Sequence, residues 1–464
     1  MARTREADYL VVGAGATGMA FTDALVTRAD VRVVVVDRRE GPGGHWRAAY
    51  PFVRLHQASQ FYGVASTMLG SGAVQTEGPE AGLHQRADRA TICAYYDDVL
   101  ARHVDSGRVE LLAGHEHVGG GRVRSLSTGE TVQVTGRAAP VRLVDARYRS
   151  PVIPAESERR YAVADDARVV PVNALADVAD APHAAVLGSG KTATDAIVHL
   201  LGRGMDPDAI TWVRPREPWM LDRARIQPDP AIFLAMVADL MDAASRAVTL
   251  DRLFEDLEES GTMLRIDRSR TPTMAKAPTL GRWELDLLRS VEHVVRLGHV
   301  RSAHRDRLEL DDGAVSLPPG AVVVDCAADG LPDRPTVPVW TPEVITPQPI
   351  RAGFPCFGAA LVGHVEGSGR EDAEKNRLCA PTEFGNSLRQ WARMTVDGAR
   401  SSAVFMAAPD IAAWVASNPL NPSRVAPSDA GRPEVRAALD RVREHSPAGI
   451  ARLDALARGE DLAP

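Results

Sequence analysis

Two short glycine-rich stretches of the chain have the residue types and spacing of phosphate-binding turns. They read GAGATG (13–18) and GSGKTA (188–193). In a strand–turn–helix unit the first glycine makes the tight turn, and the second lets a pyrophosphate approach the N–H groups at the helix N-terminus. The two stretches therefore predict two dinucleotide sites in one chain.

The second stretch also invites another interpretation, because Gly190-Lys191-Thr192 is how a nucleoside-triphosphate P-loop ends. That motif needs a glycine at position 185, where the chain has Ala185. Position 185 also falls within a predicted strand, so a loop cannot form there. The dinucleotide interpretation is therefore favoured, with Gly188, Ser189, Gly190, Lys191 and Thr192 at the pyrophosphate.

The residues that end the next strand of each unit differ in charge. Asp37 follows the first turn, and its carboxylate suits the hydroxyls of an adenosine ribose. Arg214 follows the second turn, with Arg216 just beyond, and a guanidinium suits a 2′-phosphate. The first unit is thus predicted to bind FAD or NAD, and the second NADPH. The alternative for Arg214 is a solvated loop arginine.

Hydrophobic patterning predicts the elements that hold these residues. Apolar runs at 9–12, 33–36, 184–187 and 209–213 are typical of buried parallel strands, and a helical stripe follows each glycine turn. Alternating segments at 107–114, 121–127 and 131–136 predict a small antiparallel sheet, and 307–317 predicts a hairpin. Helices are expected at about 84–104, 283–295, 384–416 and 430–458, and an apolar face from Ile232 to Met241 indicates another.

Composition excludes some classes of partner. The 464 residues carry a net charge of −7, which argues against nucleic acid and anionic lipid as the main partner. The chain contains no apolar run of membrane-spanning length and no room for a signal peptide before residue 9, so we expect a cytoplasmic protein without a membrane partner. Its four cysteines form no CxxC pair, and we expect no metal site.

The N-terminal stretch "VVGAGATGMA…VVVVDRREGPGGHW" resembles the FAD fingerprint of the flavin-dependent monooxygenase superfamily, which includes Baeyer–Villiger and N-hydroxylating enzymes. The resemblance implies an FAD site made by Gly13, Gly15, Thr17, Gly18, Asp37, Arg38, Gly44 and Trp46. The segment "YPFVRLHQAS" is similar to the one that passes the flavin ring in this family. Arg54, His56 and Gln57 are the candidate catalytic residues there.

The resemblance implies an α/β fold with two Rossmann-like dinucleotide-binding domains. The FAD-binding domain would be discontinuous, with its first part at 1–155 and its second part, with the C-terminal helices, at 331–464. The NAD(P)H-binding domain, with a helical insertion, would occupy 156–330. The signature F-x-G-x-x-x-H-x-x-x-[FY] is absent before the second turn, and neither interdomain segment reads A-T-G, so the chain resembles a divergent member.

The activity implied by the resemblance is that of an FAD- and NADPH-dependent monooxygenase. Such an enzyme uses dioxygen, through a peroxyflavin, to insert one oxygen atom into a small organic substrate. Two alternatives stay open: an NAD(P)H-dependent flavin reductase or dehydrogenase without oxygen insertion, and a non-catalytic nucleotide-binding redox sensor. The sequence predicts neither the substrate nor the oligomeric state.

Overall fold

The first large sheet consists of five parallel strands whose side chains are buried or half-buried. The structure is a computed structural model, and it describes residues 3–178, 180–327, 330–351, 353–460 and 462. The sheet has the order β21-β8-β2-β3-β4, from β2 (Tyr9–Val12), β3 (Val33–Asp37), β4 (Val109–Ala113), β8 (Arg142–Asp145) and β21 (Val344–Ile345). Every residue of β3 is buried, as expected of a parallel strand covered on both faces.

The second large sheet repeats this plan. Its order is β10-β20-β11-β12-β16, again all parallel. The strands are β10 (Val169–Pro171), β11 (Ala184–Leu187), β12 (Ile210–Val213), β16 (Val294–Val295) and β20 (Val322–Asp325). In each sheet the strand before a glycine turn is central, with its successor on one side. The predicted α/β fold with two Rossmann-like units is confirmed.

Helices cover the sheets and extend the glycine turns. The helix α1 (Ala16–Arg28) follows the first turn and α3 (Lys191–Gly202) follows the second. Near the first sheet also lie α2 (Arg89–Asp105), α7 (Pro355–Glu366) and α8 (Asp372–Leu378). α1 and α7 approach so closely that a Cβ added to Gly363 would lie 2.2 Å from the carbonyl oxygen of Phe21.

The segment at 107–114 does not belong to the small antiparallel sheet that the sequence predicts. Its strand β4 pairs in parallel with β3, with Val33 opposite Val109. The side chains of β4 do not alternate cleanly between buried and exposed, because this strand lies at the edge of a large sheet with α2 beside it. The small sheet instead has the order β1-β7-β6-β5, from β1 (Arg3–Glu6), β5 (His115–Gly119), β6 (Arg122–Ser125) and β7 (Thr131–Thr135).

Two further small sheets belong to the middle of the chain. One has the order β19-β18-β17-β9 and includes the predicted hairpin at 307–317; its strands are β9 (Ala162–Val163), β17 (Val300–Ala303), β18 (Arg307–Leu310) and β19 (Gly313–Ser316). The other, β14-β13-β15, consists of β13 (Pro218–Asp222), β14 (Met263–Arg265) and β15 (Met274–Leu280). The short 3-10 helices are η1 (Gly44–Ala48), η2 (Ser59–Phe61), η3 (Pro154–Glu156), η4 (Val172–Asp177), η5 (Pro207–Ala209) and η6 (Arg223–Arg225).

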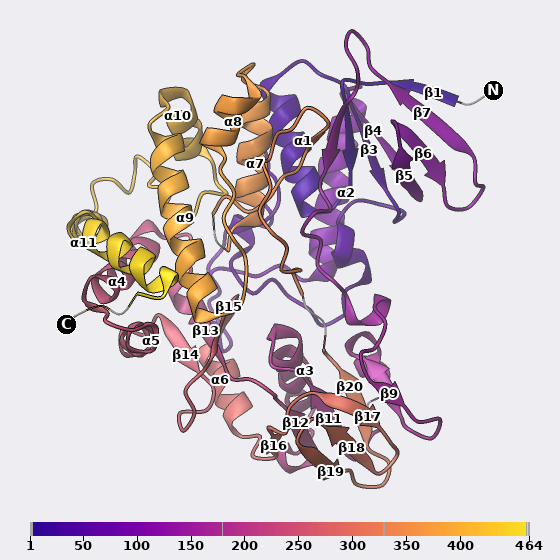
Figure 1. Cartoon of the computed structure of the whole chain (residues 1–464), viewed down its shortest axis with the longest axis vertical. Coiled ribbons are helices and arrows are strands. Elements are labelled where there is room, and N and C mark those ends of the chain that lie inside the picture. Colours follow the sequence, from indigo (N-terminus) through magenta and orange to yellow (C-terminus); the bar gives the residue numbers. More distant parts are fainter. Residues whose placement is uncertain (1–2, 179, 328–329, 352, 461, 463–464) are drawn as a thin grey trace.

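A separate helical layer joins two distant parts of the sequence. Figure 1 shows α4, α5, α9, α10 and α11 gathered on the left, away from the first sheet. Their bounds are α4 (Pro230–Arg246), α5 (Leu250–Glu259), α9 (Leu388–Met406), α10 (Pro409–Ser417) and α11 (Pro433–Arg458). The helix α6 (Arg282–Arg289) lies between this layer and the second sheet. Leu253 and Phe254 of α5 share one apolar core with Trp391 of α9 and Leu453 of α11.

The chain thus leaves the first sheet and returns to it. β21 and α7 follow the second sheet in sequence, yet β21 pairs with β8 of the first. This return agrees with a discontinuous first unit, while the domain boundaries at 155/156 and 330/331 stay a prediction. Among the residues that the structure describes, none of the helices is long and apolar enough to cross a bilayer.

Candidate functional site

The first glycine turn joins β2 to α1 in a conformation that only glycine adopts easily. Gly13 has φ +107°, and its N–H donates to the Val36 carbonyl at 2.8 Å. Gly15 caps the N-terminus of α1, and a Cβ on Gly18 would lie 1.8 Å from the Gly13 oxygen. Thr17 lies in the first turn of the same helix. The N–H groups there have no intrahelical acceptor, so this end of α1 can receive an anion.

Asp37 closes the first turn from the neighbouring strand. It is buried, and its two carboxylate oxygens accept hydrogen bonds from Ala14 N at 2.7 Å and Arg39 N at 2.9 Å. These contacts hold the carboxylate beside the turn, at the carboxyl edge of the sheet, where nucleotides bind in this kind of fold. Arg38, the other predicted residue here, is exposed.

The segment that carries Gly44 and Trp46 lies directly against the first turn. Gly43 N donates to the Ala14 carbonyl at 2.8 Å, and a Cβ on Gly44 would lie 2.8 Å from the Cα of Gly15. Trp46 is buried, and its indole N–H donates to the Tyr62 hydroxyl at 2.7 Å. The structure therefore brings the predicted FAD-site residues together at one edge of the first sheet.

The second glycine turn has the same geometry as the first. Gly188 has φ +129°, and its N–H donates to the Val213 carbonyl at 2.9 Å. Gly190 caps α3, so the N–H groups of Lys191 and Thr192 lie in its first turn. The hydroxyl of Ser189 accepts from the Arg216 N–H at 3.4 Å. The predicted pyrophosphate residues thus share one turn.

Asp37 and Arg214 occupy equivalent positions in the two units. Each directly follows the strand residue whose carbonyl accepts the hydrogen bond from the first glycine of its turn. Arg214 is buried, with its guanidinium carbon 4.3 Å from the centre of the Trp212 ring. Its Nε donates to Glu217 Oε1 at 3.1 Å. Its buried Nη1 has no hydrogen-bond partner in the described part of the chain. Burial lowers the pKa of this guanidinium.

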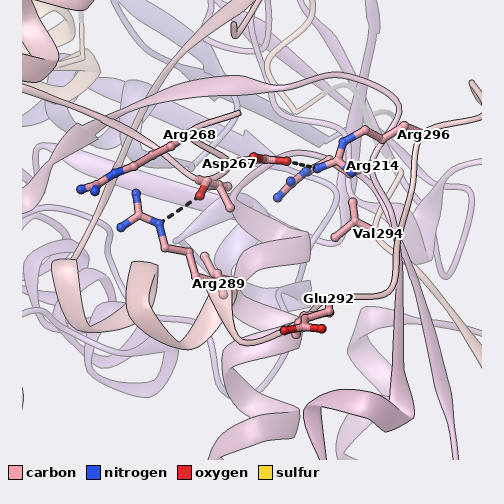
Figure 2. Close-up of a pocket in the computed structure, with 10 residues that line it drawn as sticks. Arg214, Asp267, Arg268, Arg289, Glu292, Val294 and Arg296 are labelled. Atoms are coloured by element: carbon pink, nitrogen blue, oxygen red, sulfur yellow. Dashed lines mark hydrogen bonds and ion pairs between the residues drawn. The ribbon is translucent and has the colours of Figure 1, made fainter. Parts of the chain in front are cut away.

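Arg214 lines a basic pocket of about 470 Å³. Figure 2 shows Arg268, Arg289 and Arg296 around the same pocket, together with the carboxylates of Asp267 and Glu292. Arg296 donates to Glu217 Oε1 at 2.7 Å and to Asp267 Oδ2 at 2.5 Å. The sequence analysis missed Arg268, Arg289 and Arg296. The only signal for them was a high arginine content at 265–270 and 289–296, which no short motif links to Arg214.

The predicted catalytic residues do not share one environment. Arg54 is exposed, and its Nη1 donates to the Arg86 carbonyl at 3.4 Å. His56 lies against β15, where the Thr279 N–H donates to its Nδ1 at 3.4 Å. Burial, together with the charges of Lys191, Arg223 and Arg86, lowers the pKa of His56 to about 3. Gln57 is buried. His56 is therefore a neutral imidazole at physiological pH, and the catalytic roles of all three stay a prediction.

The side chain of Lys191 binds carboxylates of this chain. Its Nζ donates to Asp195, one helical turn further along α3, and lies 3.3 Å from Glu284 Oε1. Glu284 belongs to α6, and its Oε2 also accepts from Arg223 at 2.7 Å. Lys191 thus connects the second glycine turn to a buried group of charged side chains, which the sequence did not reveal because its members lie far apart in the chain.

Comparison with known proteins agrees with this arrangement. Residues 11–61, which contain the first turn and Asp37, match the family model of an NAD(P)-binding Rossmann-like domain. The uncharacterized protein Rv2000 of Mycobacterium tuberculosis (strain ATCC 25618 / H37Rv) is 40% identical over 424 residues, which are 90% of this chain and 78% of that protein. This chain belongs to the same family as Rv2000.

Solved structures with a similar fold are flavin monooxygenases. The open crystal structure of cyclohexanone monooxygenase has a TM-score of 0.53 at 14% identity and covers 88% of this chain and 98% of its own. The NADP⁺-bound cyclohexanone monooxygenase of Rhodococcus sp. Phi1 has a TM-score of 0.50 at 13% identity, over 79% of this chain and 84% of its own. The chain therefore has the same fold as these flavin monooxygenases.

Proposed function

We propose that this chain is an FAD- and NADPH-dependent monooxygenase of a small organic molecule. One observation carries the proposal: two glycine turns with the same backbone contacts end in side chains of opposite charge, Asp37 and Arg214. A carboxylate suits the two hydroxyls of a ribose, and a guanidinium suits a 2′-phosphate. A chain with one site of each kind can hold a hydride donor and a hydride acceptor.

The residues at the two turns fit these cofactors. At the first turn, the Cβ positions of Gly18 and Gly44 are filled by backbone atoms, so the turn keeps a bare backbone surface for a pyrophosphate. At the second, Arg214 offers a buried Nη1 without a partner beside a pocket with three more arginines. A bound FAD supplies the redox chemistry of such an enzyme, accepting hydride and reacting with dioxygen.

The chain's own residues would bind and orient the two cofactors and exclude water between them. The arginine pocket would select NADPH over NADH. The half-buried, neutral His56 contacts β15 of the middle region, so it is our candidate for a residue that faces the reacting groups. The fold of the cyclohexanone monooxygenases supports oxygen insertion as the reaction class.

The visible absorption spectrum of the purified protein, reconstituted with FAD, tests the proposal. We expect a yellow protein that NADPH bleaches without air, and faster than NADH does. In air, with a panel of amines, sulfides and ketones, NADPH consumption should exceed hydrogen peroxide release for at least one compound. Peroxide equal to NADPH with every compound would indicate a flavin reductase, and a protein that does not bind FAD would be a non-catalytic scaffold.

A further inference from the structure

A buried chain of alternating charges runs from the second glycine turn to the segment that contains His56. We call it the ionic chain, and its members are Asp195, Lys191, Glu284, Arg223, Glu80 and Arg86. Arg223 donates to Glu284 Oε2 at 2.7 Å and also to Glu80 Oε1. Arg86 binds Glu80 through two hydrogen bonds of 2.8 Å, in a bidentate pair.

The ionic chain is buried and electrically balanced. The exposed fractions of its side chains run from 1% for Arg223 to 14% for Asp195, and three cations face three carboxylates. Burial raises the pKa of Glu284, but the charges of Lys191 and Arg223 outweigh it and lower the pKa to about 2. Burying ion pairs often stabilises a fold less than apolar packing would, so stability alone gives a poor account of six such side chains.

The two ends of the ionic chain lie at functionally distinct places. Lys191 is the first residue of α3, at the turn where we propose the NADPH pyrophosphate. At the other end, Arg86 Nη1 donates to the Leu55 carbonyl at 2.8 Å. Between them, Arg223 Nε donates to the His56 carbonyl at 2.9 Å. The ionic chain therefore fixes the backbone of residues 55 and 56 from two sides.

We propose that Lys191, Glu284 and Arg223 are positioning residues that adjust the His56 segment when the second glycine turn is occupied. This inference rests on the proposed function, because it needs an anion at the N-terminus of α3. A pyrophosphate there attracts the Lys191 ammonium and weakens its hold on Glu284. Glu284 then binds Arg223 more strongly, and the guanidinium shifts its contact with the His56 carbonyl. Cofactor binding thereby shifts the backbone at residues 55 and 56.

Hydrogen exchange of the FAD-loaded protein with and without NADP⁺ tests this proposal. In the wild type we expect NADP⁺ to change the exchange rates at 188–194 directly and, through the ionic chain, at 53–60 and 84–87 by roughly tenfold, within the usual range of coupling between sites. In Lys191→Met, NADP⁺ should still change the exchange rates around the Arg214 pocket but should no longer change those at 53–60. Lys191→Arg should restore it, because the charge returns. Asp195→Asn provides a second, milder variant at the more exposed end of the chain.

Lys375→Met is the matched control. Lys375 is also buried and binds a buried carboxylate, with its Nζ 2.7 Å from Glu366 Oε2, but it belongs to α8 beside the first sheet. The Lys375→Met substitution should lower the stability of the protein and leave the effect of NADP⁺ on the exchange rates at 53–60 unchanged. A wild-type response confined to 188–216, or an unchanged response in Lys191→Met, would overturn the inference alone. The absence of any response to NADP⁺, including at 188–216, would overturn the proposed function as well.

Discussion

At the scale of single residues, the two nucleotide units have the same backbone contacts but oppositely charged side chains at one equivalent position. Gly13 and Gly188 make the same contact with the next strand, and the residue after that contact is Asp37 in one unit and Arg214 in the other. Under the proposed function, this exchange of charge would let one backbone architecture select two different ligands. The specificity of the second unit would then depend on a few side chains around Arg214.

Replacing Arg214 with alanine should weaken NADP⁺ binding by roughly 10- to 100-fold, the value of one charge-assisted hydrogen bond or a bidentate pair. NAD⁺ binding should hardly change, because NAD⁺ lacks the 2′-phosphate. Titration calorimetry with both nucleotides measures the difference. Arg246→Ala is the control, since the Arg246 side chain is exposed and does not line the pocket. Equal losses for both nucleotides in Arg214→Ala would contradict the phosphate assignment.

The half-buried imidazole of His56 should make the folded protein less stable in mild acid. Its pKa falls from 6.5 to about 3 on folding, so between these values the unfolded state binds a proton that the folded state does not. Stability is therefore lost as pH falls below 6.5. The contribution is about 1.4 kcal/mol per pH unit near pH 5. Urea unfolding at pH 7, 6, 5 and 4.5 should give a shallower slope for His56→Gln than for the wild type, and equal slopes would refute the prediction.

At the scale of elements, the short-range patterns in the sequence predicted strands and turns well. Both glycine turns, their strands and the positions of Asp37 and Arg214 follow from local chemistry, because glycine spacing and apolar runs act within one βαβ unit. The segment at 107–114 was misplaced, because which sheet a strand joins depends on β3, far away in sequence. The ionic chain and the three added arginines were missed for the same reason.

The contact between α1 and α7 predicts a strict requirement for glycine at one position. Gly363→Ala adds a Cβ that would lie 2.2 Å from the Phe21 carbonyl oxygen, so the two helices must move apart. We expect a loss of about 1–3 kcal/mol in the free energy of unfolding, as for other overpacked cores. Gly202→Ala, in α3, is the control, since a Cβ there meets nothing within 4 Å. It should be neutral or gain up to about 1 kcal/mol, and urea unfolding measures both.

At the scale of the whole molecule, the middle and the end of the chain form one helical layer. Trp391 of α9 packs edge-on against Phe254 of α5, with ring centres 5.1 Å apart. The layer holds the same region of the chain that supplies Arg223 and Glu284, so the C-terminal helices support the candidate site although no predicted site residue lies in them. The position of these helices in the fold could not be derived from the sequence, because an amphipathic pattern does not show which element a helix packs against.

Trp391→Ala should therefore destabilise a segment more than a hundred residues away. We expect a loss of about 3–5 kcal/mol, the usual cost of truncating a buried aromatic side chain, with faster hydrogen exchange in α5 as well as in α9. Met406→Ala, at the exposed end of α9, should change stability by less than about 0.5 kcal/mol. If exchange in α5 stayed at the wild-type rate, the helical layer would not be a cooperative unit.

The return of the chain to its first sheet sets an order of events during translation. β8 leaves the ribosome roughly 200 residues before its neighbour β21 (Val344–Ile345), and synthesis at about 5–20 residues per second leaves one edge of that sheet unpaired for on the order of ten seconds or more. α5 likewise waits for α9 and α11. Until these later elements are made, the nascent chain exposes the edge of β8 and the apolar face of α5, so both surfaces depend on residues far along the chain for their cover.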